Sequence, residues 1–309
     1  MSKKMIAALA VALTGILACN KNYNNAPTTT YSSIKEAFNQ QAPKAKVVTI
    51  NAATGGSFRG NSGTRYVFPA NAFRNSAGDV VTGDVQVEVK EFVDKSDMMF
   101  SGVLPVTTTQ PLISGGETSV NATQNGQALT MAPGVTFQAN MPQVHNGDTA
   151  TMDVFTGHRD ANGNVVWTQN APASGGGIAF NGDTTVITND SMDMCNADRF
   201  LSSPNWQDFT IKFTMSDGSI IPNMNAKAVS GYTLYDDYNG VWPMYNQSAD
   251  NTFTEGHVPD IAVHFVIVAL INGKFYGGIL GATPATGSTY NVVLKPTTPA
   301  AFKLLVKAL

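Results

Sequence analysis

Ser57 is a candidate nucleophile, because glycines stand close to it on both sides. It lies in Gly55-Gly-Ser-Phe-Arg-Gly60, and the nucleophilic serine of a hydrolase elbow needs a glycine two positions later. Arg59 occupies that position, so the segment is more typical of a glycine turn at the start of a strand. The sequence also lacks a phosphate-binding loop that ends in Gly-Lys-Ser or Gly-Lys-Thr, and it lacks a His-Glu-x-x-His zinc motif. These patterns predict a protein without enzymatic activity.

The histidines do not predict a metal site. The four are His145, His158, His257 and His264. None lies at a spacing that would point two imidazoles of one helix or strand at the same ion. His264 stands between Val263 and Phe265, which favours a hydrogen-bonded core histidine. Residues 160–164 are similar to the start of a calcium loop, but the later bidentate glutamate is missing and a hairpin turn is favoured. We expect no metal and no cofactor.

An aromatic segment could bind sugars. Aromatic faces stack on pyranose rings, and two aspartates adjoin the aromatic residues here. The candidate ligand surface consists of Tyr235, Asp236, Tyr238 and Trp242. A tyrosine-rich strand end is the alternative interpretation, and it is favoured.

A second group of residues is expected to have a structural role. Asp198, Arg199 and Phe200 could form a salt bridge and a packed ring that hold two domains together, and a functional edge is the alternative. Cys195 has no internal partner if Cys19 carries lipid, so it is a free thiol or, as favoured, a buried apolar residue. The predicted structural cluster is Trp167, Cys195, Asp198, Arg199 and Phe200.

Cys19 indicates where the protein is located. Two lysines lead into an apolar run over residues 5–18, and Cys19 follows directly. The run is too short to span a bilayer comfortably, and the small residue before the cysteine suits a signal peptidase. Bacterial lipoproteins share this arrangement, and the resemblance implies cleavage before Cys19 and acylation of that residue. Acyl chains anchor stably when more than one is present, because each buried methylene contributes about 0.8 kcal/mol.

Asn20 bears on the choice of membrane. It stands where an aspartate would retain enterobacterial lipoproteins in the inner membrane. We therefore expect lipid anchoring to the outer membrane, with the periplasmic and cell-surface sides both open.

Composition excludes one class of partner. Charged residues make up 13% of the chain, the net charge is -3, and the basic residues are scattered. A nucleic-acid surface needs a concentrated basic patch, so nucleic acid is not an expected partner.

Alternation with a period of two dominates from residue 45 onward. In Val85-Gln-Val-Glu-Val-Lys-Glu-Phe92 the valines share one face, which is typical of a half-buried strand. Similar segments recur between turn residues such as Asn125-Gly126, a spacing that favours antiparallel sandwiches. Residues 261–271 are almost continuously apolar, and Asn272-Gly273 predicts a hairpin. The predicted fold class is all-β, with two antiparallel sandwich-like domains.

Helices are predicted only near the two ends of the chain. Ser33-Ile-Lys-Glu36 fits a capping box, and Thr298-Pro299 supplies a helix cap and a first-turn proline. A glycine run and a polar stretch after it mark a change of composition near residue 184. We therefore expect a signal peptide over residues 1–18, a lipidated tether with a short helix over 19–44, an N-terminal β-domain over 45–183 and a C-terminal β-sandwich domain over 184–309.

Several segments together resemble a ZU5-like β-domain. They are Gly55-Gly56, Gly63-Thr-Arg-Tyr-Val-Phe-Pro-Ala-Asn-Ala-Phe73 and residues 78–92. Residues 97–99, 112–116, 122–129, 153–157 and 195–200 are similar to those of a group of uncharacterised Bacteroidota lipoproteins. Some ZU5-containing proteins cleave themselves before a serine in His-Phe-Ser, and Phe100-Ser101 matches two of those three residues. Proteins of that phylum are also O-glycosylated at Asp-Ser/Thr-apolar sites, and residues 148–150, 183–185 and 190–192 fit this pattern.

These observations predict a lipid-anchored envelope protein that acts as a non-enzymatic interaction or scaffold module. Its expected partners are the membrane, through lipid on Cys19, and an envelope protein or glycan. A glycan-binding surface lipoprotein and a self-cleaving ZU5-type protein are the alternatives.

Overall fold

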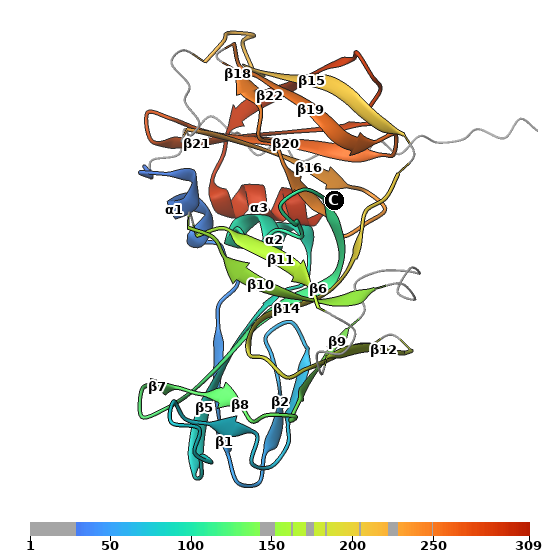
Figure 1. Cartoon of the computed structure of the whole chain (residues 1–309). Helices are drawn as coiled ribbons and strands as arrows, with labels where there is room; N and C mark the ends of the chain where they lie inside the picture. Colours follow the sequence, from blue (N-terminus) through green and yellow to red (C-terminus); the bar gives the residue numbers. More distant parts are fainter. Residues whose placement is uncertain are drawn as a thin grey trace, which may run out of the picture.

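The alternating pattern predicted from residue 45 onward corresponds to paired strands in the computed structural model of the chain. The structure describes residues 29–142, 152–161, 163–170, 176–182, 184–203, 205–221, 228–248 and 250–309. Most of these residues lie in strands, and the three helices among them are short (Figure 1). The chain therefore has an all-β, sandwich-like fold, as predicted.

The first sheet belongs to the N-terminal part of the molecule. Its seven strands are β1 (Lys46–Asn51), β5 (Asp84–Phe92), β6 (Leu112–Gln124), β7 (Gln127–Ala128), β10 (Asp153–Arg159), β11 (Val165–Gln169) and β14 (Asp193–Phe200). Their order across the sheet is β1-β5-β6-β14-β10-β11, and β7 pairs with β6. Along β5, Val85, Val87 and Val89 are buried, whereas Gln86 and Glu88 between them are exposed. The strand is thus half-buried, as its alternation predicts.

The second sheet packs against the first and shares a core with it. Its strands are β2 (Gly56–Arg59), β3 (Arg65–Phe68), β9 (Phe137–Pro142), β12 (Gly177–Asn181) and β13 (Thr184–Asn189), in the order β12-β13-β9-β3-β2. A ribbon of β4 (Phe73–Arg74) and β8 (Thr130–Met131) completes the N-terminal part. Tyr66 of β3 reaches across the core, and its hydroxyl lies 2.5 Å from Thr118 Oγ1 of β6.

The third sheet forms the C-terminal part. Its eight strands are β15 (Trp206–Met215), β16 (Val229–Tyr235), β17 (Val241–Pro243), β18 (Gln247–Ser248), β19 (Thr252–Pro259), β20 (Val263–Ile271), β21 (Lys274–Ala282) and β22 (Thr289–Pro296). Their order is β17-β16-β20-β21-β22-β15-β19-β18, and β15 and β22 are parallel. Asn272 and Gly273 have φ angles of 52° and 74° and form the predicted hairpin turn between β20 and β21.

The change from the N-terminal to the C-terminal part lies later in the chain than predicted. β13 pairs with β9, and β14 pairs with β6 and β10, so residues 184–200 belong to the N-terminal sheets. The chain enters the third sheet at Trp206. The predicted boundary at 183–184 is therefore wrong, because part of the polar composition that suggested a linker comes from buried side chains of β14, such as Asn196 and Asp198.

Three helices lie between the third sheet and strands β10, β11 and β14 (Figure 1). They are α1 (Ile34–Asn39), α2 (Lys95–Ser101) and α3 (Pro299–Lys307). Ser33 and Thr298 cap α1 and α3 as predicted, because their hydroxyls accept hydrogen bonds from backbone amides of the first turn. Helix α2 was not predicted from the sequence, although Asp94 caps its start and Gly102 ends it with a φ of 66°.

The helix layer joins the two parts. Lys303 Nζ of α3 lies 2.7 Å from Asp97 Oδ1 of α2, and Lys307 Nζ lies 3.0 Å from Asp94 Oδ2. Phe38 of α1 packs between the N-terminal and C-terminal parts. Its ring centroid lies 4.3 Å from that of Phe100 in α2 and 6.1 Å from that of Phe275 in β21. Ion pairs and aromatic contacts thus connect the N-terminal sandwich to the third sheet.

The tether enters the fold at the third sheet. Tyr31 N donates a hydrogen bond to Gly273 O at 2.8 Å, which fixes the start of the described chain beside the turn between β20 and β21. The predicted signal peptide and Cys19 lie outside the described residues. Within the described ranges, no helix combines the length and the apolar character that a membrane span requires.

Candidate functional site

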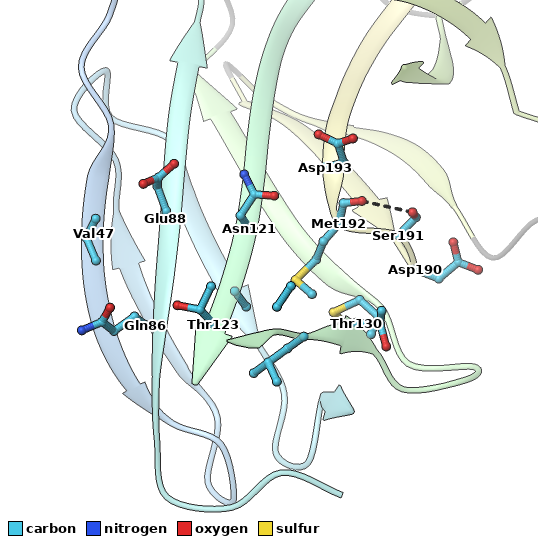
Figure 2. A pocket seen from close by; sticks show the side chains of 14 residues that line it. Val47, Gln86, Glu88, Asn121, Thr123, Thr130, Asp190, Ser191, Met192 and Asp193 are labelled. Carbon is cyan, nitrogen blue, oxygen red and sulfur yellow. Dashed lines mark hydrogen bonds between the residues drawn. The ribbon is translucent and has the colours of Figure 1, made fainter. Parts of the chain in front are cut away.

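A groove of about 600 Å³ lies on the outer face of the first sheet (Figure 2). We call it the sheet groove. Its lining comes from β1, β5, β6, the segment that contains β7 and β8, and the turn before β14, and it consists of Val47, Gln86, Glu88, Asn121, Ala122, Thr123, Ala128, Leu129, Thr130, Met131, Asp190, Ser191, Met192 and Asp193. Five segments far apart in the sequence therefore build one open surface.

The strand pattern explains how the groove forms. Gln86 and Glu88 point outward because the valines beside them fill the core of the sandwich. β6 pairs with β14 up to Val120 and then with β7 from Thr123, so the pairing partner of β6 changes beside the groove. The turn at Met192 and the segment from Ala128 onward lie next to this change.

The sheet groove is acidic. Glu88, Asp190 and Asp193 line it, and none of the described residues in its lining is cationic. Asp193 has a φ of 109°, a backbone conformation that is costly for a residue with a side chain. Amide and hydroxyl groups of Asn121 and Thr123 add further polar contacts beside apolar atoms. The surface therefore suits a ligand rich in hydrogen-bond donors or positive charge.

A second polar group is closed to solvent. Glu117 and Asp198 are fully buried, and both accept hydrogen bonds from Asn196 Nδ2, at 3.1 Å and 2.5 Å. Ser114 Oγ donates to Asn196 Oδ1 at 2.9 Å. Glu117 Oε2 and Asp198 Oδ1 have no hydrogen-bond partner among the described atoms.

Burial governs the protonation of this carboxyl pair. It raises the pKa of Glu117 well above its ordinary value, and the negative charge of Asp198 raises the pKa of Glu117 further. Burial likewise raises the pKa of Asp198. A substrate could not reach either side chain, because neither is exposed. The pair is thus part of the protein interior rather than a site for acid–base catalysis.

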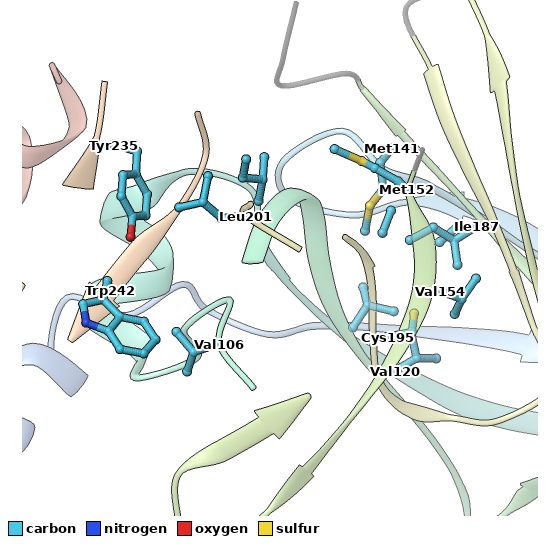
Figure 3. Close-up of a cluster of buried hydrophobic side chains, with 14 of the residues drawn as sticks. Val106, Val120, Met141, Met152, Val154, Ile187, Cys195, Leu201, Tyr235 and Trp242 are labelled. Carbon is cyan, nitrogen blue, oxygen red and sulfur yellow. The ribbon is translucent and has the colours of Figure 1, made fainter. Parts of the chain in front are cut away.

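The predicted ligand surface is not a stacking surface. Tyr235 is fully buried and Trp242 is 6% exposed, and both belong to the core that Figure 3 shows. Asp236 Oδ1 lies 2.6 Å from His264 Nδ1, which confirms the hydrogen-bonded histidine, although His264 is only half-buried. Tyr238 is half-buried beneath the guanidinium group of Arg199. The favoured interpretation, a tyrosine-rich strand end, agrees with β16, which ends at Tyr235, whereas burial of Tyr235 and Trp242 speaks against the sugar-binding alternative.

Glu255 of β19 is a buried acid that was not predicted as a site residue from the sequence. It is 4% exposed, and burial raises its pKa to about 7. Trp242 Nε1 donates to its Oε2 at 3.4 Å, whereas its Oε1 has no hydrogen-bond partner among the described atoms. The period-two pattern could have found this residue, because Phe253, two positions earlier, faces the core.

The predicted structural cluster divides between two regions. Trp167 is buried and its Nε1 donates to Leu104 O at 2.9 Å. Cys195 is buried in the sandwich core, and burial raises its pKa to about 12, so it is a protonated core thiol. Phe200 is 36% exposed and packs edge-to-face on Phe155. The five residues therefore do not form one cluster.

The expected Asp198–Arg199 ion pair is replaced by other contacts. Asp198 bonds to Asn196, as described above, on the buried side of β14. The guanidinium carbon of Arg199 lies 5.3 Å from the ring centroid of Tyr238, so this residue contacts the C-terminal part. Arg199, rather than Asp198, is the residue of this segment that helps to join the two parts.

Ser101, beside the expected self-cleavage bond, lies in α2. Phe100 is fully buried, and Ser101 Oγ donates to Asp97 O at 2.7 Å and to Met98 O at 3.1 Å. The hydroxyl is therefore engaged by helix carbonyl groups rather than aimed at the preceding peptide bond.

One of the three expected glycosylation sites is exposed. Ser191 lies at the rim of the sheet groove, and its Oγ donates to Met192 O at 3.2 Å (Figure 2). Residues 148–150 and Asp183 lie outside the described residues.

The described part of the chain holds no group of three or more histidine, cysteine or acidic side chains arranged to bind a metal ion. What the geometry offers instead is an open acidic groove, the buried carboxyl pair of Glu117 and Asp198, and the buried Glu255. Comparison of the chain with protein-family models, with curated proteins and with solved structures found no match.

Proposed function

We propose that this protein is a lipid-anchored envelope protein that acts as a non-enzymatic interaction module and binds its partner in the sheet groove. The observation that carries the proposal is the groove itself. Its volume of about 600 Å³ lies within the usual range of ligand sites. Polar groups such as Glu88 and Asn121 lie beside Met192 and Leu129, so the lining offers both hydrogen-bond acceptors and apolar contact.

The arrangement of the molecule supports presentation of this groove to a partner. The tether joins the fold at Tyr31, beside the third sheet. The groove strands β1, β5 and β7 lie at the other end of the molecule (Figure 1). The helix layer holds the two ends together through Asp97 and Lys303. A chain anchored near the third sheet would therefore present the groove away from the lipid surface.

Photo-crosslinking in intact cells tests the groove. A photoreactive amino acid at Thr130, an exposed residue of the lining, should give one discrete crosslinked product. The same amino acid at Thr254, an exposed residue of the C-terminal part, is the matched control and should not give that product. Identical product patterns at both positions would contradict a partner in the groove.

Metabolic labelling tests the anchor separately. Protein with Cys19 should take up radioactive palmitate and fractionate with outer membranes, whereas Cys19→Ala should do neither. Wild-type protein that takes up no palmitate would contradict the lipid anchor. The proposed binding of a partner in the sheet groove would still stand.

A glycan is the second candidate partner. It would bind in the sheet groove rather than at Tyr235 and Trp242, because those two residues are buried. Carboxylate and amide oxygens of Glu88 and Asn121 can accept hydrogen bonds from sugar hydroxyls. Binding on a glycan array should fall at least tenfold in Asn121→Leu and stay unchanged in Gln138→Leu, an exposed residue of the second sheet. An array without signal would leave a polypeptide as the partner.

A further inference from the structure

A second cavity, of about 380 Å³, lies where the tether enters the fold. We call it the helix cavity. Its walls come from α1, α2, the turn between β10 and β11, and β16. It therefore forms only when the tether helix, the N-terminal sandwich and the third sheet are assembled.

The rim of the helix cavity is positively charged. Lys35 and Arg159 line it, and none of the described lining residues is acidic. Arg159 Nη1 lies 2.8 Å from Gly163 O, and Lys35 Nζ lies 3.9 Å from the point where a Cβ atom on Gly163 would stand. Two side chains from different parts of the sequence thus bring their charges to the same turn.

The carboxylates nearest in sequence to these two cations have other partners. Glu36 accepts hydrogen bonds from Ser32 N at 2.7 Å and from Ser32 Oγ at 2.6 Å. Asp160 Oδ1 accepts from Asn164 N at 2.9 Å. The ion pairs of the described residues include neither Lys35 nor Arg159, so both cations are available to an anion.

The floor of the helix cavity is aromatic. Phe38 and Phe100 lie with their ring centroids 4.3 Å apart, and the centroid of Tyr232 lies 6.3 Å from that of Phe38. All three rings line the cavity, but Phe38 and Phe100 are buried, so the half-buried Tyr232 offers the accessible ring. A cationic rim above an apolar floor matches a molecule with an anionic head and a hydrocarbon body.

We propose that the helix cavity binds the phosphate headgroup of an anionic amphiphile. The phosphate oxygens accept hydrogen bonds from Lys35 and Arg159, and the first carbon atoms of the amphiphile pack on the half-buried ring of Tyr232. The inference is independent of the sheet groove, since the two sites share no residue.

The position of the cavity favours a membrane lipid as the source of the phosphate. Ser32 lines the cavity and follows Cys19 by 13 residues in the sequence. A chain of that length spans at most about 45 Å when fully extended. An acylated Cys19 would therefore hold the cavity within reach of lipid headgroups.

Calorimetry with short-chain lipids tests the proposal without interference from the anchor. The full protein in a non-ionic detergent is titrated with dihexanoyl phosphatidylglycerol, with dihexanoyl phosphatidylcholine and with inorganic phosphate. We expect the anionic lipid to bind more tightly than either of the others. Lys35→Gln and Arg159→Gln should each weaken that binding about fivefold, the amount that one cation contributes near an anionic headgroup.

Controls separate the cavity from general charge and from misfolding. Lys212→Gln removes an exposed cation of β15 and should leave lipid binding unchanged. Lys35→Arg keeps the charge and should restore binding to within twofold of the wild type.

The three ligands also distinguish the sources of the phosphate. Inorganic phosphate that binds as tightly as the anionic lipid would overturn the amphiphile. The anion site would be overturned if the neutral lipid bound as tightly as the anionic lipid. It would also be overturned if Lys35→Gln and Lys212→Gln lost the same affinity for the anionic lipid.

Discussion

Glu255→Gln should remove a strong pH dependence from the stability of the protein. Glu255 is almost fully buried, and its pKa is about 7 in the folded chain against an ordinary 4.5. A difference of this size corresponds to about 3 kcal/mol between the two protonation states. Glutamine has the same shape and stays neutral, so the variant measures what the ionised carboxylate costs.

The direction follows from which state holds the proton. Below pH 4.5 the folded and unfolded chains are both protonated at Glu255, and the full stability is present. Between pH 4.5 and pH 7 the unfolded chain loses this proton while the folded chain keeps it, so the contribution to stability falls as pH rises. By pH 8 the wild type has lost about 3 kcal/mol through this residue, and Glu255→Gln has not.

Urea denaturation of both proteins at pH 4, 6 and 8 measures the effect. We subtract the free energy of unfolding of the wild type from that of the variant. This difference should rise by about 3 kcal/mol from pH 4 to pH 8. Other titrating groups are common to both proteins and cancel in this difference. Glu88→Gln, which removes an exposed carboxylate, is the matched control. A difference for Glu255→Gln that stays constant across this range would refute a protonated, buried Glu255.

Three further predictions concern the interior and the contact between the two parts. Trp242→Ala should lower the free energy of unfolding by about 3–5 kcal/mol, because it empties a core position, and chemical denaturation measures this loss. Lys303→Ala should cost about 1–3 kcal/mol, because it leaves the buried Asp97 without its ion pair, whereas Lys212→Ala should change stability little in the same assay. Cys195 should react with a thiol reagent only after denaturant is added, since it is buried and protonated, and rapid labelling of the native protein would contradict this.

Local features of the fold could be predicted because they depend on neighbouring residues. The valines of β5 define a strand through their spacing alone, and Asn272-Gly273 defines a hairpin because both residues tolerate a positive φ. Ser33 and Thr298 mark helix starts through hydroxyl groups that accept backbone hydrogen bonds. Each signal lies within a few residues of the element that it specifies.

Features that depend on distant segments could not be predicted in this way. An aromatic strand such as that around Trp242 has the same local pattern whether solvent or another layer of the protein covers it. The polar residues of β14 have the composition of a linker, although they are buried. Asn196 can be buried because it donates a hydrogen bond to Glu117 of β6, a residue far away in the sequence. The sheet groove joins five separated segments, and no spacing along the chain indicates that they meet.

The place of Phe38 determines how the molecule would respond to tension on its tether. Its ring lies between Phe100 of the N-terminal part and Phe275 of the C-terminal part. A force applied through Tyr31 therefore acts first on the single backbone hydrogen bond to Gly273 and then on α1, before it reaches any strand ladder. Removal of α1 would take Phe38 out of the contact between the two parts. A pulled tether would thus loosen the junction between the parts while both β-sheet bodies were still intact.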